Sequence, residues 1–242
     1  MVIIIPCYNE YSRLNKNDFT IFLTKNHDVK IIFSDDASVD GTINILEDIQ
    51  ANFKSQVYVL KLQTNLGKGE AIRKGVIYAF EQNISFNKIA YLDADLSVSL
   101  EECFLLASHL NHEKLVVFGS RISKIDNTII RNYFRHYSGR FLAKIISMIL
   151  KISIYDSQCG CKIFDTKLAR EIFQEPFISR WLFDVELFFR IKKLYSLKDL
   201  KEMSLEIPLS SWIDKSHSKV KLTYFFKMWQ DLYLINKKYE KY

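Results

Sequence analysis

The sequence predicts an α/β fold: a mainly parallel central sheet flanked by helices, with amphipathic helices toward the C-terminus. Two observations predict it. Short runs of β-branched and apolar residues alternate with longer helical patterns through residues 1–120, and this alternation is typical of a parallel sheet covered on both faces. Polar loops follow the runs, at the strand ends where such sheets bind ligands.

Five strands are predicted in this first half, at Val2–Ile5, Val29–Ser34, Gln56–Leu62, Lys88–Leu92 and Leu115–Gly119. The helices predicted between them are Asp18–Lys25, Gly41–Phe53, Gly67–Glu81 and Leu100–Leu110. The polar loops are Pro6–Glu10, Asp35–Gly41, Asn65–Gly69, Asp93–Asp95 and Gly119–Arg121. Because the carboxyl ends of parallel strands share one edge, we expect these five loops to form one site.

The second half of the chain has longer helical patterns. A helix is predicted over Arg131–Ile154, followed by a polar segment, Asp156–Gly160. Another helix is predicted near Arg180–Leu194, then a strand near Leu200–Leu209 and a closing amphipathic helix, Val220–Lys238.

Composition narrows the partners and the compartment. The net charge of +6 and the pI near 9.0 favour an anionic partner, which leaves nucleic acid, an acidic membrane surface or a phosphorylated substrate open. The four cysteines lack the paired spacing of a zinc site, so we expect reduced structural thiols, as in the cytosol. The chain starts without a basic signal-peptide region and contains no run of about 18 apolar residues, so the sequence predicts no membrane-spanning segment.

Asp93 and Asp95 directly follow the predicted strand Lys88–Leu92. Two carboxylates in this arrangement can reach one divalent ion, and hard oxygen ligands suit Mg²⁺ or Mn²⁺. Such an ion could neutralise charge on a departing diphosphate. Acidic residues at a strand end are also common as solvated turns, so the pattern by itself leaves both interpretations open.

Two further loops carry candidate nucleotide contacts. Asp40 is predicted to cap the following helix, whereas Asp35 and Asp36 could accept hydrogen bonds from a base or ribose, or form a solvated turn. Lys68 lies between two glycines at a predicted helix N-terminus, a natural neighbour for phosphate. Neither the P-loop pattern nor G-x-G-x-x-G is present, which argues against a P-loop ATPase and a nicotinamide enzyme.

Four of these segments occur in the order found in one enzyme family: Ile5–Glu10, Asp35–Thr42, Asn65–Gly69 and Asp93–Ser97. Together they resemble family 2 glycosyltransferases with the GT-A fold. Later segments resemble the dolichyl-phosphate glucosyltransferase branch and its bacterial polyprenyl-phosphate relatives; they are Phe118–Arg121, Asp156–Lys162, Phe183–Glu186 and Trp212–Lys219. The mannosyl relatives carry an arginine where this chain has Trp212–Asp214, which favours a glucosyl enzyme.

The resemblance implies a role for each candidate residue. Residues implied to hold the nucleotide are Pro6, Tyr8, Glu10, Asp36 with Asp35 behind it, and Ala94. Asp93 and Asp95 would hold Mg²⁺ or Mn²⁺, with Ser97 in the outer shell. Arg121 and Lys219 would face the donor diphosphate or the acceptor phosphate.

The resemblance also implies inversion at the anomeric carbon by one in-line displacement. Asp156 and Asp184 are its candidate base or acceptor-orienting residues, with Asp156 ranked first. A phosphate acceptor is already an anion and scarcely needs a base. The expected organisation is a single domain over residues 1–242: a nucleotide-binding half (1–121), an acceptor-binding half (122–219) and a C-terminal amphipathic helix (220–242).

The expected reaction moves a hexose, glucose from UDP-glucose, to a polyprenyl or dolichyl phosphate, in the cytoplasm at the inner face of a membrane. The basic amphipathic helices Arg131–Ile154 and Val220–Lys238 could lie in the headgroup plane or pack their apolar faces on the sheet. Arg131, Arg135 and Arg140 could also meet an acceptor phosphate.

Three other functions are open at this point. A family 2 enzyme could extend a glycan hydroxyl, which would need a real base. A nucleotidyltransferase would release pyrophosphate, but its glycine- and arginine-rich first loop is missing. A nucleic-acid-binding module fits the basic charge but shows no binding motif, and we expect no nucleic-acid partner.

Overall fold

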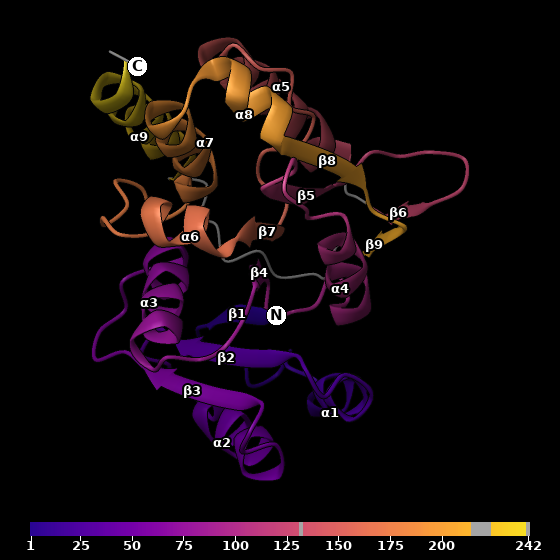
Figure 1. Cartoon of the computed structure of the whole chain (residues 1–242). Helices are drawn as coiled ribbons and strands as arrows, with labels where there is room; N and C mark the ends of the chain where they lie inside the picture. The colour runs from indigo at the N-terminus through magenta and orange to yellow at the C-terminus, as the bar shows by residue number, and fades with distance from the viewer. Residues whose placement is uncertain (131–132, 214–223, 241–242) are drawn as a thin grey trace.

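The structure is a computed structural model that describes residues 1–130, 133–213 and 224–240. Its seven-stranded sheet has the order β3-β2-β1-β4-β7-β5-β8, running from the bottom to the top of Figure 1. The strands are β1 (Val2–Cys7), β2 (Lys30–Asp35), β3 (Val57–Lys61), β4 (Lys88–Leu92), β5 (Val116–Ser120), β7 (Cys161–Asp165) and β8 (Ser204–Pro208). Every neighbouring pair is parallel except those of β7, which runs antiparallel to β4 and β5.

Helices cover both faces of this sheet. The helices are α1 (Lys16–Lys25), α2 (Thr42–Asn52), α3 (Lys68–Glu81), α4 (Leu100–Ser108), α5 (Tyr133–Leu150), α6 (Thr166–Ile172), α7 (Phe183–Leu194), α8 (Leu197–Met203) and α9 (Tyr224–Tyr239). Helices α1, α2 and α4 contribute to the core on one face, and the other helices named here contribute to the core on the opposite face. Strands β6 (Thr128–Ile130) and β9 (Ser211–Ile213) form a separate parallel pair, at the right of Figure 1.

Strand β1 shows why this sequence needs two helical layers. Ile3 and Ile5 point into one core, whereas Val2 and Ile4 point into the other, and all four are fully buried. Successive strand residues face opposite sides of a sheet, so a continuous apolar run requires cover on both faces. The predicted fold class, a mainly parallel sheet between helices, is confirmed.

The five strands and four helices predicted for the first half are all present, with ends that differ by at most two residues. The four cysteines are free and buried. Asp40 was predicted to be the N-cap residue of α2, but Gly41 occupies that position, one residue later. The Asp40 carboxylate nevertheless accepts a hydrogen bond from the Thr42 amide at 2.9 Å.

The second half differs more from the prediction. The predicted strand Leu200–Leu209 is wrong at its start, because residues 197–203 form α8 and β8 begins at Ser204. Ser196 caps α8 by accepting from the Asp199 amide at 3.0 Å, and Leu200 and Met203 bury one face of the helix.

Other elements of the second half have different bounds or were not predicted. Helix α5 ends at Leu150, four residues before the predicted end, and α7 begins at Phe183, three residues after the predicted start. The predicted starts of α5 and α9 lie outside the described residues. Strands β6, β7 and β9 and helix α6 were not predicted.

The two amphipathic helices use their apolar faces for packing. In α9, Met228, Leu232 and Ile235 are buried in the core shared with α7. In α5, one face is buried in the same core through Leu142, Ile146 and Leu150. Across the described residues, no helix combines the length and apolarity needed to cross a bilayer. Membrane contact by the outer faces stays a prediction.

Candidate functional site

The first two loops of the site are joined by hydrogen bonds. The backbone amide of Asn9 donates to Ser38 Oγ at 2.9 Å, and the amide of Glu10 donates to Thr42 Oγ1 at 2.7 Å. The Glu10 carboxylate is buried and binds the guanidinium of Arg13 through two contacts of 2.6 and 2.8 Å. These bonds hold the loop after β1 against the loop after β2.

Of the three nucleotide contacts predicted in the first loop, two follow β1 and one lies within it. Pro6 is part of β1, and Tyr8 follows the strand with about a third of its surface (36%) exposed. Glu10 is 6% exposed and is engaged by Arg13. Tyr8 is therefore more accessible to a ligand than Glu10.

Asp35 and Asp36 are both buried and both hold loop backbone in place. The Asp35 carboxylate accepts from the amide of Ser38 at 3.1 Å and from its hydroxyl at 2.5 Å. The two oxygens of Asp36 accept from the amides of Leu66 and Gly67, each at 2.7 Å. Burial raises the pKa of Asp36, and these two amide hydrogen bonds oppose the shift. Each oxygen keeps a second lone pair, so a contact to base or ribose stays a prediction.

Asp93, Asp95 and Lys68 meet at the end of β4. The ammonium of Lys68, in the first turn of α3, lies 2.5 Å from Asp93 Oδ1. The Asp95 carboxylate accepts from the amide of Ser97 at 2.9 Å, and Ala94 between the two aspartates is 5% exposed. The residues predicted for a metal and phosphate site are thus neighbours in space.

Gly160 gives Asp93 its position. The amide of Asp93 donates to the carbonyl of Gly160 at 3.2 Å. A Cβ atom on Gly160 would lie 2.2 Å from Asp93 Oδ2, closer than any real contact. Only glycine therefore allows the segment that enters β7 to pass this close to the carboxylate.

The charge around Asp93 fits a divalent cation. Burial raises the pKa of Asp93, and the nearby carboxylates of Asp95 and Asp184 raise it further, while Lys68 opposes them. Surplus negative charge of this kind is what a hard cation such as Mg²⁺ or Mn²⁺ offsets. Within the described part of the chain, no group of three or more His, Cys, Asp or Glu residues is arranged around one point. A cation held by Asp93 and Asp95 alone would keep positions for substrate oxygens.

Arg121 and Asp156 form a buried ion pair at the end of β5. Arg121 Nε and Nη2 lie 2.6 and 2.7 Å from the two oxygens of Asp156, and the Arg121 amide donates to Oδ2 at 3.1 Å. Burial alone would raise the pKa of Asp156, but the charge and hydrogen bonds of Arg121 lower it to about 2. Trp212 in β9 packs against the guanidinium, 5.3 Å from the ring centroid. Asp156 therefore stays ionised near neutral pH as the partner of Arg121.

Asp184 lies behind these loops in the first turn of α7, 3% exposed. Lys162 in β7, fully buried, donates to Asp184 Oδ1 at 2.5 Å and to the Cys159 carbonyl at 2.9 Å. The Tyr91 hydroxyl donates to the same carboxylate oxygen. Burial and the Asp184 charge raise the pKa of Tyr91 well above its usual value. Asp184 is thus an ion-paired group that is close enough to influence the charge of Asp93.

Sequence reasoning did not assign roles to Lys162, Tyr91 or Gly160. Lys162 and Gly160 fall within the segment Asp156–Lys162 that carried part of the resemblance. The signal for Lys162 and Tyr91 was that each lies inside an otherwise apolar strand. A buried charge is almost always paired, so such a lysine is expected to have a partner.

Some of the predicted phosphate contacts cannot be placed. Lys219 and Arg131 lie outside the described residues. Arg140 is described in α5, where its guanidinium stacks on the Tyr155 ring and donates to the Tyr155 carbonyl at 2.7 Å.

The sheet order, with helices on both faces and carboxylates at one edge, defines the fold class as GT-A. Solved structures of glucosyl-3-phosphoglycerate synthase from Mycobacterium tuberculosis share the fold. The one in complex with Mn²⁺, UDP-glucose and glycerol 3-phosphate matches with a TM-score of 0.67 at 14% identity, over 99% of this chain and 79% of that chain.

Sequence comparison gives the family. Residues 2–173 match the family described as "Glycosyl transferase family 2", and the chain belongs to this family. Dolichyl-phosphate beta-glucosyltransferase of Drosophila melanogaster is 31% identical over 252 aligned positions, covering 96% of this chain and 73% of the relative. The Homo sapiens protein of the same name is 29% identical, covering 98% and 75%. The predicted family and its GT-A fold are confirmed.

Proposed function

We propose that this chain transfers glucose from UDP-glucose to a polyprenyl- or dolichyl-type lipid phosphate, with inversion at the anomeric carbon. One observation carries the proposal: two relatives named dolichyl-phosphate beta-glucosyltransferase align with 96% and 98% of the chain, so the alignments include both the segments around Asp93 and those around Asp156. In the reaction, a phosphate oxygen of the acceptor bonds to the anomeric carbon. The bond from that carbon to the donor diphosphate breaks, and UDP leaves.

The state of the two candidate bases supports a phosphate acceptor. Asp156 is held by Arg121, which lowers its pKa to about 2, and Asp184 is paired with buried Lys162. An effective general base needs a pKa near the working pH. A glycan hydroxyl would require such a base, whereas a lipid phosphate is already ionised. These pairings favour lipid phosphate over the glycan alternative, and in this proposal Asp156 acts by holding Arg121.

The donor would occupy the edge formed by β1, β2 and β4. Asp93 and Asp95 would hold Mg²⁺ or Mn²⁺, with Ser97 supporting Asp95 through its amide. The ion would supply positive charge to the diphosphate. Lys68 at the N-terminus of α3 would contact the same phosphates once a cation takes its place beside Asp93.

The remaining assignments complete the proposal. The nucleotide would be lined by Pro6, Tyr8, Glu10 and Ala94, with Asp35 and Asp36 fixing the loops around it. Arg121 and Lys219 would face the diphosphate or the acceptor phosphate.

The proposal also assigns regions of the chain and a compartment. Residues 1–121 would bind the nucleotide, residues 122–219 would bind the acceptor, and residues 220–242 would form a C-terminal amphipathic helix. We place the reaction in the cytoplasm at the inner face of a membrane. Four free thiols fit a reducing compartment.

A transfer assay tests the proposal. Purified protein is incubated with labelled UDP-glucose and polyprenyl phosphate, with Mn²⁺ or with EDTA, and with GDP-mannose as the competing donor. We expect organic-soluble label from UDP-glucose only when the metal is present. Label that enters a water-soluble glycan instead, or no metal-dependent transfer to lipid, would contradict it.

Asp156→Asn separates the two acceptor chemistries. Its activity is compared with wild type per folded molecule, with Asp126→Asn on the exposed loop before β6 as the matched control. Transfer to lipid phosphate should survive at a reduced rate, because the acceptor brings its own charge. Near-complete loss in the folded variant would show that Asp156 is a base and would favour a hydroxyl acceptor.

A further inference from the structure

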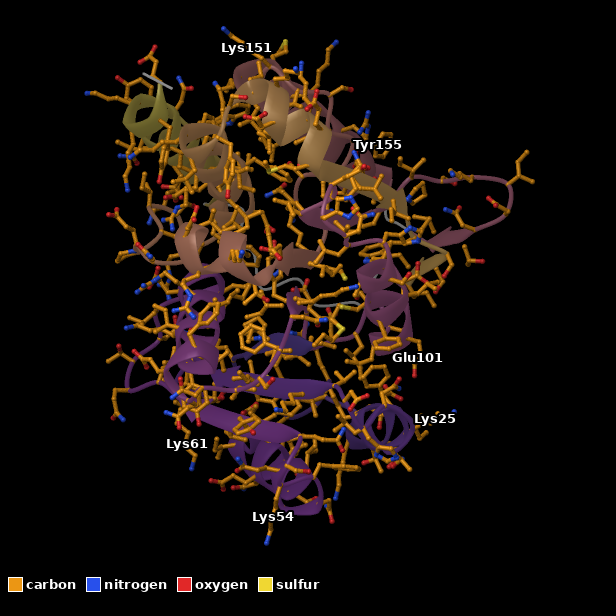
Figure 2. All side chains as sticks on the ribbon, viewed as in Figure 1. Lys25, Lys54, Lys61, Glu101, Lys151 and Tyr155 are labelled. Atoms are coloured by element: carbon orange, nitrogen blue, oxygen red, sulfur yellow. The ribbon has the colours of Figure 1, made fainter. Side chains whose placement is uncertain are left out.

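The loop that precedes α3 is held from two sides. It starts after Lys61, the last residue of β3, which is labelled at the lower left of Figure 2, and it leads to Lys68 in the first turn of α3. On one side of the loop, Asp36 accepts from two of its backbone amides, each at 2.7 Å. On the other side lies Arg180, which is 115 residues later in the chain than its partner Asn65.

Arg180 is bonded to this loop through both its side chain and its backbone. Its Nη2 donates to the Asn65 carbonyl at 3.1 Å and also to the Asn65 side-chain oxygen. The Arg180 carbonyl accepts from the amide of Gly69 at 3.4 Å. Hydrogen bonds from an ionised donor are roughly twice as strong as neutral ones. Arg180 therefore bridges the loop from Asn65 to Gly69, and Lys68 lies between these two contacts.

The two glycines that flank Lys68 make room for the same segment. A Cβ atom on Gly67 would lie 3.0 Å from the Cβ of Arg180 and closer still to its Nε. A Cβ atom on Gly69 would lie 2.8 Å from the Cβ and Cγ of Phe183. Gly67 also has a φ of +95°, which other residues rarely adopt. Both glycines therefore allow close packing within the protein on either side of Lys68.

The segment that carries Arg180 is itself anchored in the core. Its neighbour Ser179 is 1% exposed and donates to Asp231 Oδ2 of α9 at 2.6 Å. The Ser179 hydroxyl also accepts from the amide of Leu182 at 2.9 Å, directly before α7. The Arg180 side chain is exposed, but the backbone on either side of it is fixed by these buried contacts. Arg180 can therefore hold the loop in one position.

We propose that Arg180 is a positioning residue for the donor, because it fixes the loop backbone from which Lys68 reaches the donor phosphates. This inference rests on the proposed function, in which Lys68 contacts the diphosphate. A group that is held in place before the donor arrives loses less conformational freedom when the donor binds. Removing the Arg180 side chain should therefore weaken donor binding and leave the acceptor side, around Arg121 and Asp156, unchanged.

Calorimetric titration of the full chain with UDP and Mn²⁺ tests the effect on binding. Arg180→Gln should weaken UDP binding about ten-fold, the usual effect of losing one charged hydrogen bond. Arg180→Lys should recover part of this loss, because an ammonium can still donate to Asn65 but lacks the arginine fork. Arg170→Gln is the matched control: this exposed guanidinium stacks on Phe80, near the other end of α3, at 4.3 Å. It should bind UDP like wild type.

Amide hydrogen exchange measures the loop directly, with no substrate present. We expect residues 65–69 to exchange faster in Arg180→Gln than in wild type or Arg170→Gln, with exchange in the core strand β1 unchanged. The Arg180 side chain is exposed, so the thermal midpoint should stay near that of wild type. Unchanged exchange in the loop, or equal UDP affinities in Arg180→Gln and Arg170→Gln, would each overturn the proposal.

The transfer assay separates this inference from the proposed function. Arg180→Gln should raise the UDP-glucose KM and leave the acceptor KM unchanged, a split that a general loss of stability would not produce. Transfer with an unchanged UDP-glucose KM in Arg180→Gln would overturn the inference and retain the function. A chain that shows the expected loss of UDP binding but transfers no glucose to lipid phosphate would retain the inference and contradict the function. A wild-type chain that binds no UDP would contradict both.

Discussion

Two aspartates at neighbouring parts of the same sheet edge have opposite electrostatics. Asp93 follows β4, stands near two other carboxylates and has a raised pKa, because burial and repulsion outweigh the single ammonium of Lys68. Asp156 is paired through both oxygens with Arg121 beyond β5, and its pKa is about 2. The side chain of Asp156 is 9% exposed against 37% for Asp93, so burial alone would give the opposite order. The difference therefore comes from the charges near each group.

Asp93 is suited to bind a cation, whereas Asp156 is already paired with the positive charge of Arg121. Asp93 lies in surplus negative charge that a metal ion and a donor phosphate together could balance. Asp156 is balanced within the protein, and its contribution is to orient Arg121. A carboxylate in a family motif is therefore not automatically a base, and its partners decide its chemistry.

Among the variants that test this comparison, Asp93→Asn should have the largest effect on activity. We expect transfer to fall roughly a thousand-fold or more, since metal charge stabilisation is worth several kcal/mol and each 1.36 kcal/mol is about a factor of ten. The thermal midpoint should not fall at neutral pH, because the substitution relieves repulsion with Asp95 and Asp184. Steady-state kinetics and calorimetric melting measure both effects, with Asp126→Asn as the control.

Asp156→Asn should show the reverse pattern, a loss of stability larger than its loss of chemistry. Removing one member of a buried ion pair leaves the other charge uncompensated and typically costs about 3–5 kcal/mol. Urea unfolding monitored by tryptophan fluorescence measures the change in unfolding free energy. A variant as stable as wild type would show that water reaches Arg121 and replaces the carboxylate.

Gly160→Ala tests whether the position of the Asp93 carboxylate matters for activity. The new methyl would lie 2.2 Å from Asp93 Oδ2, so the carboxylate must move. A displacement of about 1 Å in a catalytic group can reduce the rate about a hundred-fold. Gly41→Ala is the matched control, since the three atoms nearest to its methyl belong to the ring of Tyr11, which is largely exposed and can turn away. Equal activities in the two variants would contradict the proposed importance of the Asp93 position.

Acid unfolding gives the smallest expected effect and separates the two carboxyl groups by sign. The folded-state pKa of Asp156 is about 2 against an ordinary value of 3.8. Its contribution of roughly 2 kcal/mol is present above the ordinary value and is lost as the pH falls toward 2. Asp93 has a raised pKa, so its protonation favours the folded state as the pH falls. Unfolding free energies measured between about pH 5 and 2 should decline less steeply in Asp156→Asn than in wild type.

Much of the site could be predicted because it lies in local segments. The loops after β1, β2 and β4 follow strands whose apolar runs are read directly from the sequence, and parallel strands bring their ends to one edge. Asp93, Asp95 and Lys68 were expected near one another, and the structure places them there. The metal and nucleotide roles of these residues stay predictions.

The second half of the chain was predicted less accurately, because its residues contact residues far away in the sequence. Strand β7 inserts antiparallel between β4 and β5, and both of these partners lie far earlier in the chain. Asp156 was predicted as a base or an acceptor-orienting residue without a partner being named, because its partner Arg121 is 35 residues earlier in the chain. Helix α8 replaced the start of a predicted strand because a short apolar run suits either element until its burial is known.

The sequence by itself determined the fold class, the family and the edge of the sheet where the chemistry lies, since periodicity and ordered motifs are local properties of the chain. Tertiary structure alone decided which carboxylate is neutralised. It paired Asp156 with Arg121 and Asp184 with Lys162, and it left Asp93 with more negative than positive charge around it. The physical reason is that a pKa depends on burial and on charges brought close by folding, and neither can be read from residue order.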